Sequence, residues 1–594
     1  MVSRVPVLEV RPCIERGTRP ARLVVGEPLE VEALVAGESA DVVGADVVLV
    51  DPGGTARAPV PLERGEDDVW RTTVVADAPG SWWLHVRSWL DPVRTWAAGA
   101  VDDLDHGADP DAVLAHGSRL LATLGAQDPA AFSIGEDLLD TEADPVTRLA
   151  EALAYLQTLP EEIGRVPQET SPALPVLVEE PGALVGAWYQ TFPRSDGAHR
   201  GPDGAVVGGT LATATKRLEQ IAAMGFDTVH LPPLHPRADE SPWSVGTSAG
   251  GHEAVDPELG THEDVQAYVE RARQLDLHVA LELSWDAASS HPWVSEHPHW
   301  YVPTRGGRWR LDVASDAAAV AEALETVVRT WVADGIQRFV MADAARQPAG
   351  FWGLLHERLA DVPGLVTVAA GDMTRVQAHA LTTAGFTQVT PPLHRCVGVN
   401  DVARALHSIT RATVRRPHLQ IASAHRLPEQ LASAAEPHVR PWTAVAALAS
   451  PTWSTCAGLE RLEPSAVRHG HRRVADVEGP VVREDGDRPA VLAELYARLN
   501  ELRRLHPALR SRRGLQVHPL HHAGVLAFTR RAEGDEVTVV ADLFPSFEKS
   551  VGLSADLLTR DDGRVQDQLD GSWHRLDAVR LDPAHPVRVL TRGR

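Results

Sequence analysis

Two aspartates in the middle of the chain follow short apolar runs of the kind that form buried strands. Residues 336–341, IQRFVM, are bounded by Gly335 and a polar segment and precede Asp343, and residues 365–370 precede Asp372. In a (β/α)8 barrel the chemistry takes place at the C-terminal ends of the strands. Two carboxylates held close together there can act as a nucleophile and a general acid/base. These two strand ends are therefore the candidate site.

The surrounding sequence has the pattern needed to position such a site. Between residues 171 and 510, short apolar runs alternate with amphipathic helical patterns. Repeated strand-then-helix order over this length favours one (β/α)8 TIM barrel over two smaller α/β domains. The expected strands are residues 185–192, 228–231, 278–283, 336–341, 365–370, 386–389, 419–422 and 444–448.

Other patterns flank the expected barrel. Residues 1–105 alternate apolar runs with Gly, Pro and Asp turns, which predicts an immunoglobulin-like β-sandwich. Residues 106–170 form a helical insert, and residues 511–594 return to strand-type alternation, which predicts a C-terminal β-sandwich. The fold class expected is therefore multidomain α/β, with a central TIM barrel between two sandwiches.

Two amphipathic helices are predicted in the helical insert. Each begins with an aspartate as N-cap and a proline in the first turn, at Asp109-Pro110 and at Asp144-Pro145. Their apolar stripes have no partner in the neighbouring sequence. We expect them to pack on each other and on a second subunit. The alternative is a helical linker that lies on the barrel.

Composition narrows the classes of function. The net charge of −24 disfavours binding to nucleic acid or to an anionic membrane. No signal peptide and no 18-residue apolar run is evident, so we expect a cytoplasmic protein. Three distant cysteines offer no disulfide framework and no metal-ligand spacing, and we expect neither a metal nor a cofactor.

Several stretches of the expected barrel, given at the end of this paragraph, share specific motifs with one known family. The chain resembles the α-1,4-glucan:maltose-1-phosphate maltosyltransferases, a branch of the α-amylase superfamily (glycoside hydrolase family 13). The order of domains agrees as well. The resemblance implies action on an α-glucan and a dimer built on the helical insert. The stretches are AWYQTFPRS (187–195), MGFDTVHLPPLHP (224–236), SPWSVGTSAGG (241–251), VDPELGT (255–261) and HPWVSEHPHW (291–300).

The catalytic positions implied by this resemblance carry other residues here. Ala342 stands at the nucleophile and Gly371 at the general acid, while His425 stands at the third carboxylate. Val340 replaces an arginine, and Asp286 replaces a substrate-facing amide. A lysine-bearing insert and a Lys-Tyr pair of the family are also absent. The expected function is that of a catalytically inactive paralogue in α-glucan metabolism, with a glycan-binding or regulatory role.

Two alternatives stay open. One is an active maltosyltransferase or glycosidase that uses Asp343 and Asp372, each displaced by one residue from the family position. In a regular strand such a shift turns the side chain to the opposite face, away from the barrel axis. The other alternative is an interaction protein that pairs with an active maltosyltransferase.

Aromatic and polar residues near the expected barrel mouth are candidates for contacts with an α-glucan or maltooligosaccharide, although such residues often belong to the scaffold instead. The expected assembly is a homodimer or a heterodimer with an active relative. The candidate binding residues are Trp188, Tyr189, His235, His252, Asp286 and His291.

Overall fold

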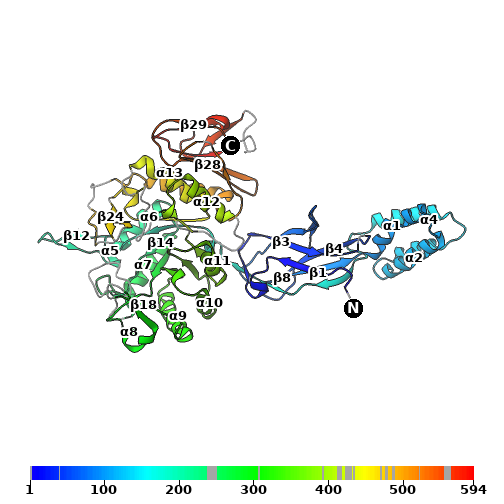
Figure 1. Ribbon diagram of the computed structural model, residues 1–594, viewed down its shortest axis with the longest axis horizontal. Helices are drawn as coiled ribbons and strands as arrows, with labels where there is room; N and C mark the ends of the chain where they lie inside the picture. The colour runs from blue at the N-terminus through cyan, green and yellow to red at the C-terminus, as the bar shows by residue number, and fades with distance from the viewer. Residues whose placement is uncertain are drawn as a thin grey trace. The chain divides into compact units, whose positions relative to one another are not determined.

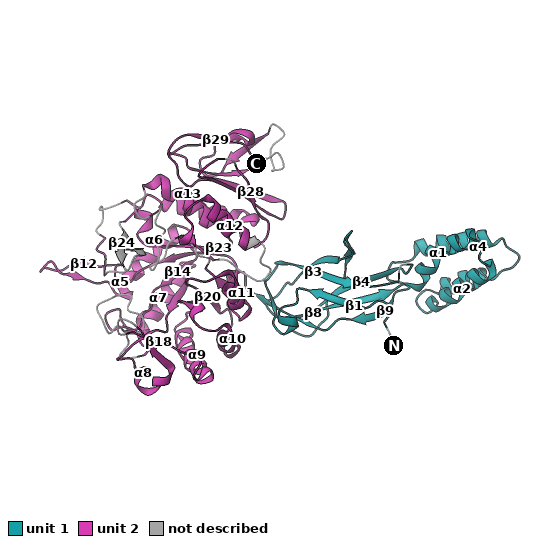
Figure 2. Cartoon of the chain, viewed as in Figure 1, with its two compact units in different colours: residues 1–179 teal, residues 180–594 magenta. Residues whose placement is uncertain are grey.

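The computed structural model divides the chain into two compact units, residues Met1–Glu179 and Glu180–Arg594 (Figure 2). The first holds the N-terminal sheets and helices, and the second holds the barrel and the C-terminal sheets. The structure describes residues 3–38, 40–236, 251–304, 308–390, 393–410, 418–421, 431, 435–463, 465–468, 471–474, 476, 479–483, 489–520, 522–553 and 563–593.

Unit 1 contains two sheets that share one apolar core. Strand β8 shows why they pack, because alternate residues such as Trp82, Leu84 and Val86 are buried while their neighbours face outward. One sheet has the order β1 (Val7–Arg11), β3 (Pro28–Val35), β7 (Trp70–Val75), β6 (Glu63–Arg64). The other has the order β2 (Ala21–Val24), β10 (Leu174–Glu179), β8 (Gly80–Leu90), β4 (Val43–Val50), β5 (Val60–Pro61), with β9 (Val166–Thr170) beside β8.

Two boundaries of this region differ from the sequence prediction. The first helix begins at Pro92, well before residue 106. The chain also returns to the N-terminal sheet as β10, which pairs with β2 and β8, so that unit 1 extends to Glu179 rather than ending at residue 170. Residues of β10 pair with residues of β2 that lie 155 positions earlier, such as Val176 with Ala21, and such a pairing leaves no local sequence signal.

Four helices make up the helical segment of unit 1. They are α1 (Pro92–Asp105), α2 (Pro110–Leu124), α3 (Pro129–Asp137) and α4 (Pro145–Thr158). Each begins at a proline that follows a capping aspartate, whose carboxylate accepts a hydrogen bond from a first-turn N–H.

The apolar stripes of α2 and α4 are buried within this one chain. Leu114 and Leu121 of α2 and Leu149 and Leu156 of α4 belong to a single core, to which Trp96 of α1 also contributes. The structure therefore supplies the partners that the sequence left open. Unpartnered stripes no longer argue for a second subunit.

The sheet of unit 2 consists of eight parallel strands in the order β21-β20-β19-β15-β14-β11-β23-β22. Strand β11 pairs with both β14 and β23, so the first strand joins the last. This is a (β/α)8 barrel, as predicted, with helices on the outer side of the strands (Figure 1). The strands are β11 (Gly186–Gln190), β14 (Thr228–Leu231), β15 (His278–Leu283), β19 (Arg338–Met341), β20 (Val366–Ala369), β21 (Gln388–Val389), β22 (His418–Gln420) and β23 (Thr452–Cys456).

The predicted eighth strand was wrong. Residues 444–448 lie inside helix α13 (Glu436–Ala449), and the eighth strand is β23, which follows it. The reason is that α13 is buried on nearly all sides, and a short apolar run does not distinguish a buried helix from a buried strand. The other barrel helices are α5 (Leu211–Ala214), α6 (Leu218–Ala223), α7 (His262–Gln274), α9 (Ala317–Ala333), α10 (Ala349–Arg358), α11 (Arg375–Thr383), α12 (Val399–Thr410), α14 (Ala493–Leu505) and α15 (Pro507–Arg510).

Short elements decorate the barrel. Helix α8 (Pro292–Glu296) and the sheet of β16 (Ala287–Ala288), β18 (Arg308–Leu311) and β17 (Tyr301–Pro303) follow the third strand. Two hairpins complete the set, β12 (His199–Arg200) with β13 (Val206–Val207), and β24 (Ser465–Arg468) with β25 (His471–Val474).

The C-terminal strands form a six-stranded sheet and a two-stranded sheet. One face of the large sheet joins the barrel core, and the other covers a separate small core. The strands are β26 (Leu515–His518), β27 (Val525–Ala532), β28 (Asp535–Asp542), β33 (Val587–Thr591), β30 (Arg564–Asp567) and β31 (Trp573–Arg575), with β29 (Lys549–Val551) paired to β32 (Val579–Leu581).

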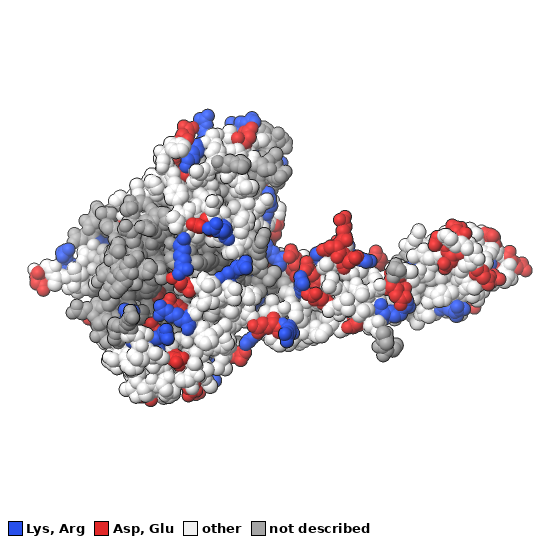
Figure 3. Space-filling view, viewed as in Figure 1, with Lys and Arg blue, Asp and Glu red and all other residues white. Residues whose placement is uncertain are grey.

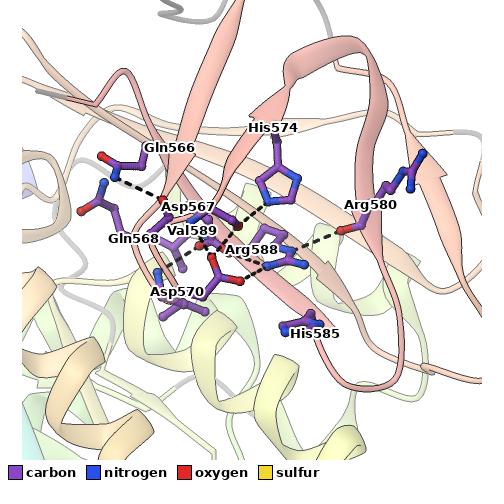
Figure 4. Close-up of polar contacts among 12 residues, drawn as sticks. Gln566, Asp567, Gln568, Asp570, His574, Arg580, His585, Arg588 and Val589 are labelled. Carbon is purple, nitrogen blue, oxygen red and sulfur yellow. Dashed lines mark hydrogen bonds and ion pairs between the residues drawn. The ribbon is translucent and has the colours of Figure 1, made fainter.

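A buried arginine holds the end of this sheet together (Figure 4). Arg588 donates to Asp567 at 2.9 Å and to Asp570 at 2.5 Å, and its Nε donates to the Arg580 carbonyl. Asp567 also accepts the Val589 N–H at 3.0 Å, so both charges are paired inside the domain. The cluster joins strands β32 and β33 to the end of β30 and the turn that follows it.

Charge is unevenly distributed over the described surface. In the view of Figure 3, acidic atoms gather on the helical end of unit 1. Exposed contributors there include Asp109, Asp111, Glu136, Asp137 and Asp140. This distribution is unfavourable for binding a polyanion. Within the described residues, no helix is both long and apolar enough to cross a membrane.

Candidate functional site

The nucleophile position lies at the end of the fourth barrel strand. Strand β19 ends at Met341, and the Ala342 N–H still donates to the Leu283 carbonyl at 2.9 Å. Asp343 then adopts a left-handed conformation, with φ 49° and ψ 36°. Asp343 lies beyond the end of the strand. The alternation of side chains along a strand, from which we predicted that Asp343 points away from the barrel axis, therefore does not apply to it. Aspartate tolerates this conformation better than most residues do.

The Asp343 carboxylate is half exposed and shares an arginine with Asp286. Arg346 Nη2 lies 3.0 Å from Asp343 Oδ2, and Arg346 Nη1 lies 3.5 Å from Asp286 Oδ2. Burial raises the pKa of Asp286; the Arg346 charge opposes that rise and the Asp343 charge adds to it. The ends of the third and fourth strands are thus joined by one guanidinium between two carboxylates.

The position of the general acid is sterically closed. Gly371 has φ +106°, a conformation that residues with a side chain rarely adopt. A Cβ on Gly371 would lie 2.9 Å from the Asp343 Cα and 2.8 Å from its Oδ1. The first of these contacts is with backbone, which cannot rotate away. The end of the fourth strand therefore occupies the space that a side chain at residue 371 would need.

Asp372, the second displaced candidate, has a different partner. Arg395 Nη2 lies 2.8 Å from Asp372 Oδ2, and Arg395 belongs to the 3-10 turn Leu393–Arg395 after the sixth strand. Asp343 is paired with an arginine of the turn after its own strand, and Asp372 with an arginine of the turn after the sixth strand. The two carboxylates thus have different arginine partners.

Trp188 and Tyr189, proposed from sequence as sugar contacts, are fully buried. The Trp188 ring lies edge-on to His418 at 4.8 Å between centroids. The Tyr189 hydroxyl donates to Glu460 at 2.9 Å and accepts from Arg217 at 3.0 Å. Neither ring offers a face to a sugar, and both belong to the packed scaffold of the barrel.

The three candidate histidines form one buried aromatic cluster after the second and third strands. The His252 ring lies 5.3 Å from His235 and 4.5 Å from His291. His291 Nδ1 accepts the Trp293 N–H at 3.1 Å and so caps helix α8 as a neutral imidazole. Burial lowers the pKa of His235 and of His291 to about 4, and it lowers that of His252 further. The cluster is therefore uncharged at neutral pH.

A polar layer lies inside the barrel beneath the mouth. Glu282 of β15 is buried, accepts from Gln190 Nε2 at 3.2 Å and lies 3.6 Å from His230 Nε2. Sequence reasoning missed this layer because the three residues stand in three separate strands. It also missed Arg346 and Arg395. The i, i+3 spacing of Asp343 and Arg346 was a usable signal, whereas Arg395 had none.

Two further points concern the third carboxylate position and metal binding. His425, at the third carboxylate position, falls in a segment that the structure does not describe. Within the described residues, no group of three or more His, Cys, Asp or Glu side chains is arranged to hold a metal ion.

Solved structures identify the class of this fold. The α-amylase from Geobacillus thermoleovorans, in a complex with acarbose, superposes with a TM-score of 0.57 over 68% of this chain and 97% of that chain, at 17% identity. A maltogenic α-amylase from Thermotoga neapolitana gives 0.54 over 68% and 96%, at 16% identity. Unit 2 thus contains a (β/α)8 barrel with the fold found in these α-amylases.

Sequence comparison then gives the family. The profile described as α-1,4-glucan:maltose-1-phosphate maltosyltransferase, domain N/S, matches residues 3–180. Maltosyltransferase 1 of Streptomyces coelicolor is 33% identical over all of this chain and 95% of its own length. The enzymes of Corynebacterium pseudotuberculosis and Mycobacterium tuberculosis are 31% and 29% identical, over 99% and 98% of this chain and 96% and 95% of their own. The chain belongs to the α-1,4-glucan:maltose-1-phosphate maltosyltransferase family.

Proposed function

We propose that this chain is a catalytically silent maltosyltransferase paralogue of cytoplasmic α-glucan metabolism, which retains contacts with α-glucan. The observation that carries the proposal is the steric closure of Gly371 by Asp343. A side chain lost by substitution alone would leave room for its return. Here the neighbouring backbone fills that room, as expected for a site no longer selected for transfer.

The chemistry supports the same conclusion. A retaining mechanism needs an oxygen nucleophile below the anomeric carbon and a proton donor beside the leaving oxygen. The methyl group of Ala342 cannot attack, and Gly371 has no group to donate. General acid–base catalysis contributes roughly 10²–10⁴-fold, and loss of the nucleophile removes the covalent route altogether.

The second candidate function is transfer or hydrolysis by Asp343 and Asp372, and it is favoured by their places at neighbouring strand ends. Their ion pairs argue against it. Asp343 is paired with Arg346 and Asp372 with Arg395, so each ion pair must break before the carboxylate can contact a substrate.

An assay with maltose 1-phosphate and a maltooligosaccharide acceptor decides between these functions. We expect no transfer and no hydrolysis by the purified protein. The Streptomyces coelicolor relative, assayed in parallel, is the positive control. Activity that disappears in both Asp343→Ala and Asp372→Ala would establish the displaced pair and contradict silence. Activity that disappears in neither would also contradict it and would require another site.

We also propose that the protein assembles as a homodimer or with an active relative, and the contact surface must differ from the one first expected. The stripes of α2 and α4 are internal, but Phe132, Leu139 and Val146 are 49%, 53% and 66% exposed. These side chains would supply the apolar contact. Light scattering at micromolar concentration should give the mass of a dimer, alone or with the relative added. A monomer under both conditions would contradict the proposal.

A further inference from the structure

The outer face of the six-stranded sheet in unit 1 carries an exposed indole. Trp83 lies on strand β8 and is 46% exposed, whereas the adjacent Trp82 faces the core and is 1% exposed. Strand alternation places Ser81 and His85 on the same outer face as Trp83. Two groups able to hydrogen-bond therefore flank the ring along the strand.

The neighbours of Trp83 across the sheet are small and apolar. The residue pairs with Val50 of β4 on one side and with Pro175 of β10 on the other. Both are half-buried, and neither side chain is large enough to overhang an indole. The result is a low shelf with one aromatic ring in its middle.

Charge and area on this face define what it can bind. Arg22 and Glu179, on the same face, are bonded to each other, and Arg87, two residues beyond His85, lies 3.9 Å from Asp46, so these charges are paired. A stable protein interface buries about 800 Å² on each partner. A whole tryptophan buries about 150–250 Å², and only about half of this one is exposed. The exposed part of Trp83 is much smaller than such an interface and has the size to stack on a single uncharged ring.

We propose that Trp83, Ser81 and His85 form a surface site for a neutral α-glucan chain, separate from the barrel mouth. The C–H face of a pyranose ring would stack on the indole, and its hydroxyls would bond to the serine and the histidine. The choice of α-glucan among neutral sugars rests on the proposed function, whereas the site itself rests on the geometry of the sheet.

Retention of the full-length protein in native gels containing glycogen tests this site. The expected change for Trp83→Ala is a loss of affinity of about two- to tenfold, as for one aromatic stacking contact. Trp83→Phe should keep a substantial part of the affinity, because it keeps a ring. Trp573→Ala is the matched control, because Trp573 is an exposed indole of unit 2 (37%) and its removal should change nothing.

The outcomes separate this site from the proposed function. If Trp83→Ala binds like the wild type while Asp286→Ala at the barrel mouth loses retention, the surface site is refuted and glucan binding at the mouth stands. Equal retention of the wild type by an unrelated β-glucan would refute the α-glucan assignment. If Trp83→Ala weakens retention while the transfer assay finds activity, the surface site stands and catalytic silence fails.

Discussion

At the scale of single residues, Asp343 and Gly371 are in close steric contact. Gly371 lies in the left-handed region, and its missing Cβ leaves the space in which the Asp343 backbone lies. Asp343 in turn is held in its own left-handed conformation by its place between a strand and a 3-10 turn. The resemblance to the family showed that Ala342 and Gly371 differ from the catalytic residues expected there. It could not show this steric contact, because residue types alone do not give backbone dihedral angles.

Restoring a carboxylate at residue 371 should therefore fail. Gly371→Glu forces a side chain into φ +106° and against the Asp343 Cα. The left-handed conformation alone costs roughly 1–2 kcal/mol, and overpacking adds roughly 1–3 kcal/mol. We expect a lower unfolding free energy, measured by chemical denaturation, and no gain of transfer activity.

Gly350→Glu is the matched control for this substitution. Gly350 lies in helix α10, and a Cβ there would meet no atom within 4 Å. The same chemical change should be tolerated at that position. If Gly371→Glu were as stable as Gly350→Glu, or if it transferred maltose, the steric contact between residues 343 and 371 would be refuted.

At the scale of elements, local signals were sufficient where a helix has its own start signal. Asp109-Pro110 and Asp144-Pro145 predicted α2 and α4, and both helices begin where expected. The same Asp-Pro pair stands at Asp91-Pro92 and Asp128-Pro129, where α1 and α3 begin, so the starts of these two helices could also have been predicted from the sequence. Their packing was not readable, because it depends on which stripes meet in space.

The contact between α1 and α2 gives a sharp test of that packing. A Cβ on Gly117 of α2 would lie 2.1 Å from the ring of Trp96, which is buried and donates to the Val113 carbonyl at 3.0 Å. Gly117→Ala should lower the unfolding free energy by about 1–3 kcal/mol, although alanine favours the helix by about 1 kcal/mol.

Gly99→Ala in helix α1 separates packing from helix propensity. A Cβ at Gly99 meets no atom within 4 Å, so the propensity gain should appear there alone as a small stabilisation. Thermal and denaturant unfolding of both variants, followed by circular dichroism, makes the comparison. A stabilised Gly117→Ala would show that α1 and α2 do not pack as described.

At the scale of the whole molecule, the barrel is built around histidines that are buried without charge. His235, His252 and His291 lie together near the mouth, and His418 lies inside the barrel against Trp188. Burial lowers the pKa of His418 to about 3 and that of His235 and His291 to about 4. From sequence, His235, His252 and His291 were candidates for sugar binding, because their burial depends on residues that are distant in the chain.

This burial predicts that the protein loses stability in mild acid. The unfolded chain binds protons at these four histidines as the pH falls through about 6.5, whereas the folded chain does not until about pH 4 or below. Each such histidine costs up to about 1.4 kcal/mol per pH unit in that window. Asp196 acts in the opposite direction, because burial raises its pKa to about 6, and it offsets roughly one of the four. The apparent melting temperature should therefore fall steadily from pH 7 to pH 5.

A variant of the cluster tests this explanation. His252→Phe removes one buried imidazole from the middle of the cluster, so unfolding should take up about one proton fewer and the fall with pH should be shallower. His262, which is 38% exposed in its side chain and pairs with Asp334 instead, provides the control, and His262→Gln should leave the fall due to the buried histidines in place. A melting temperature independent of pH between 7 and 5, or a slope unchanged by His252→Phe, would mean that the cluster does not remain neutral in the folded protein.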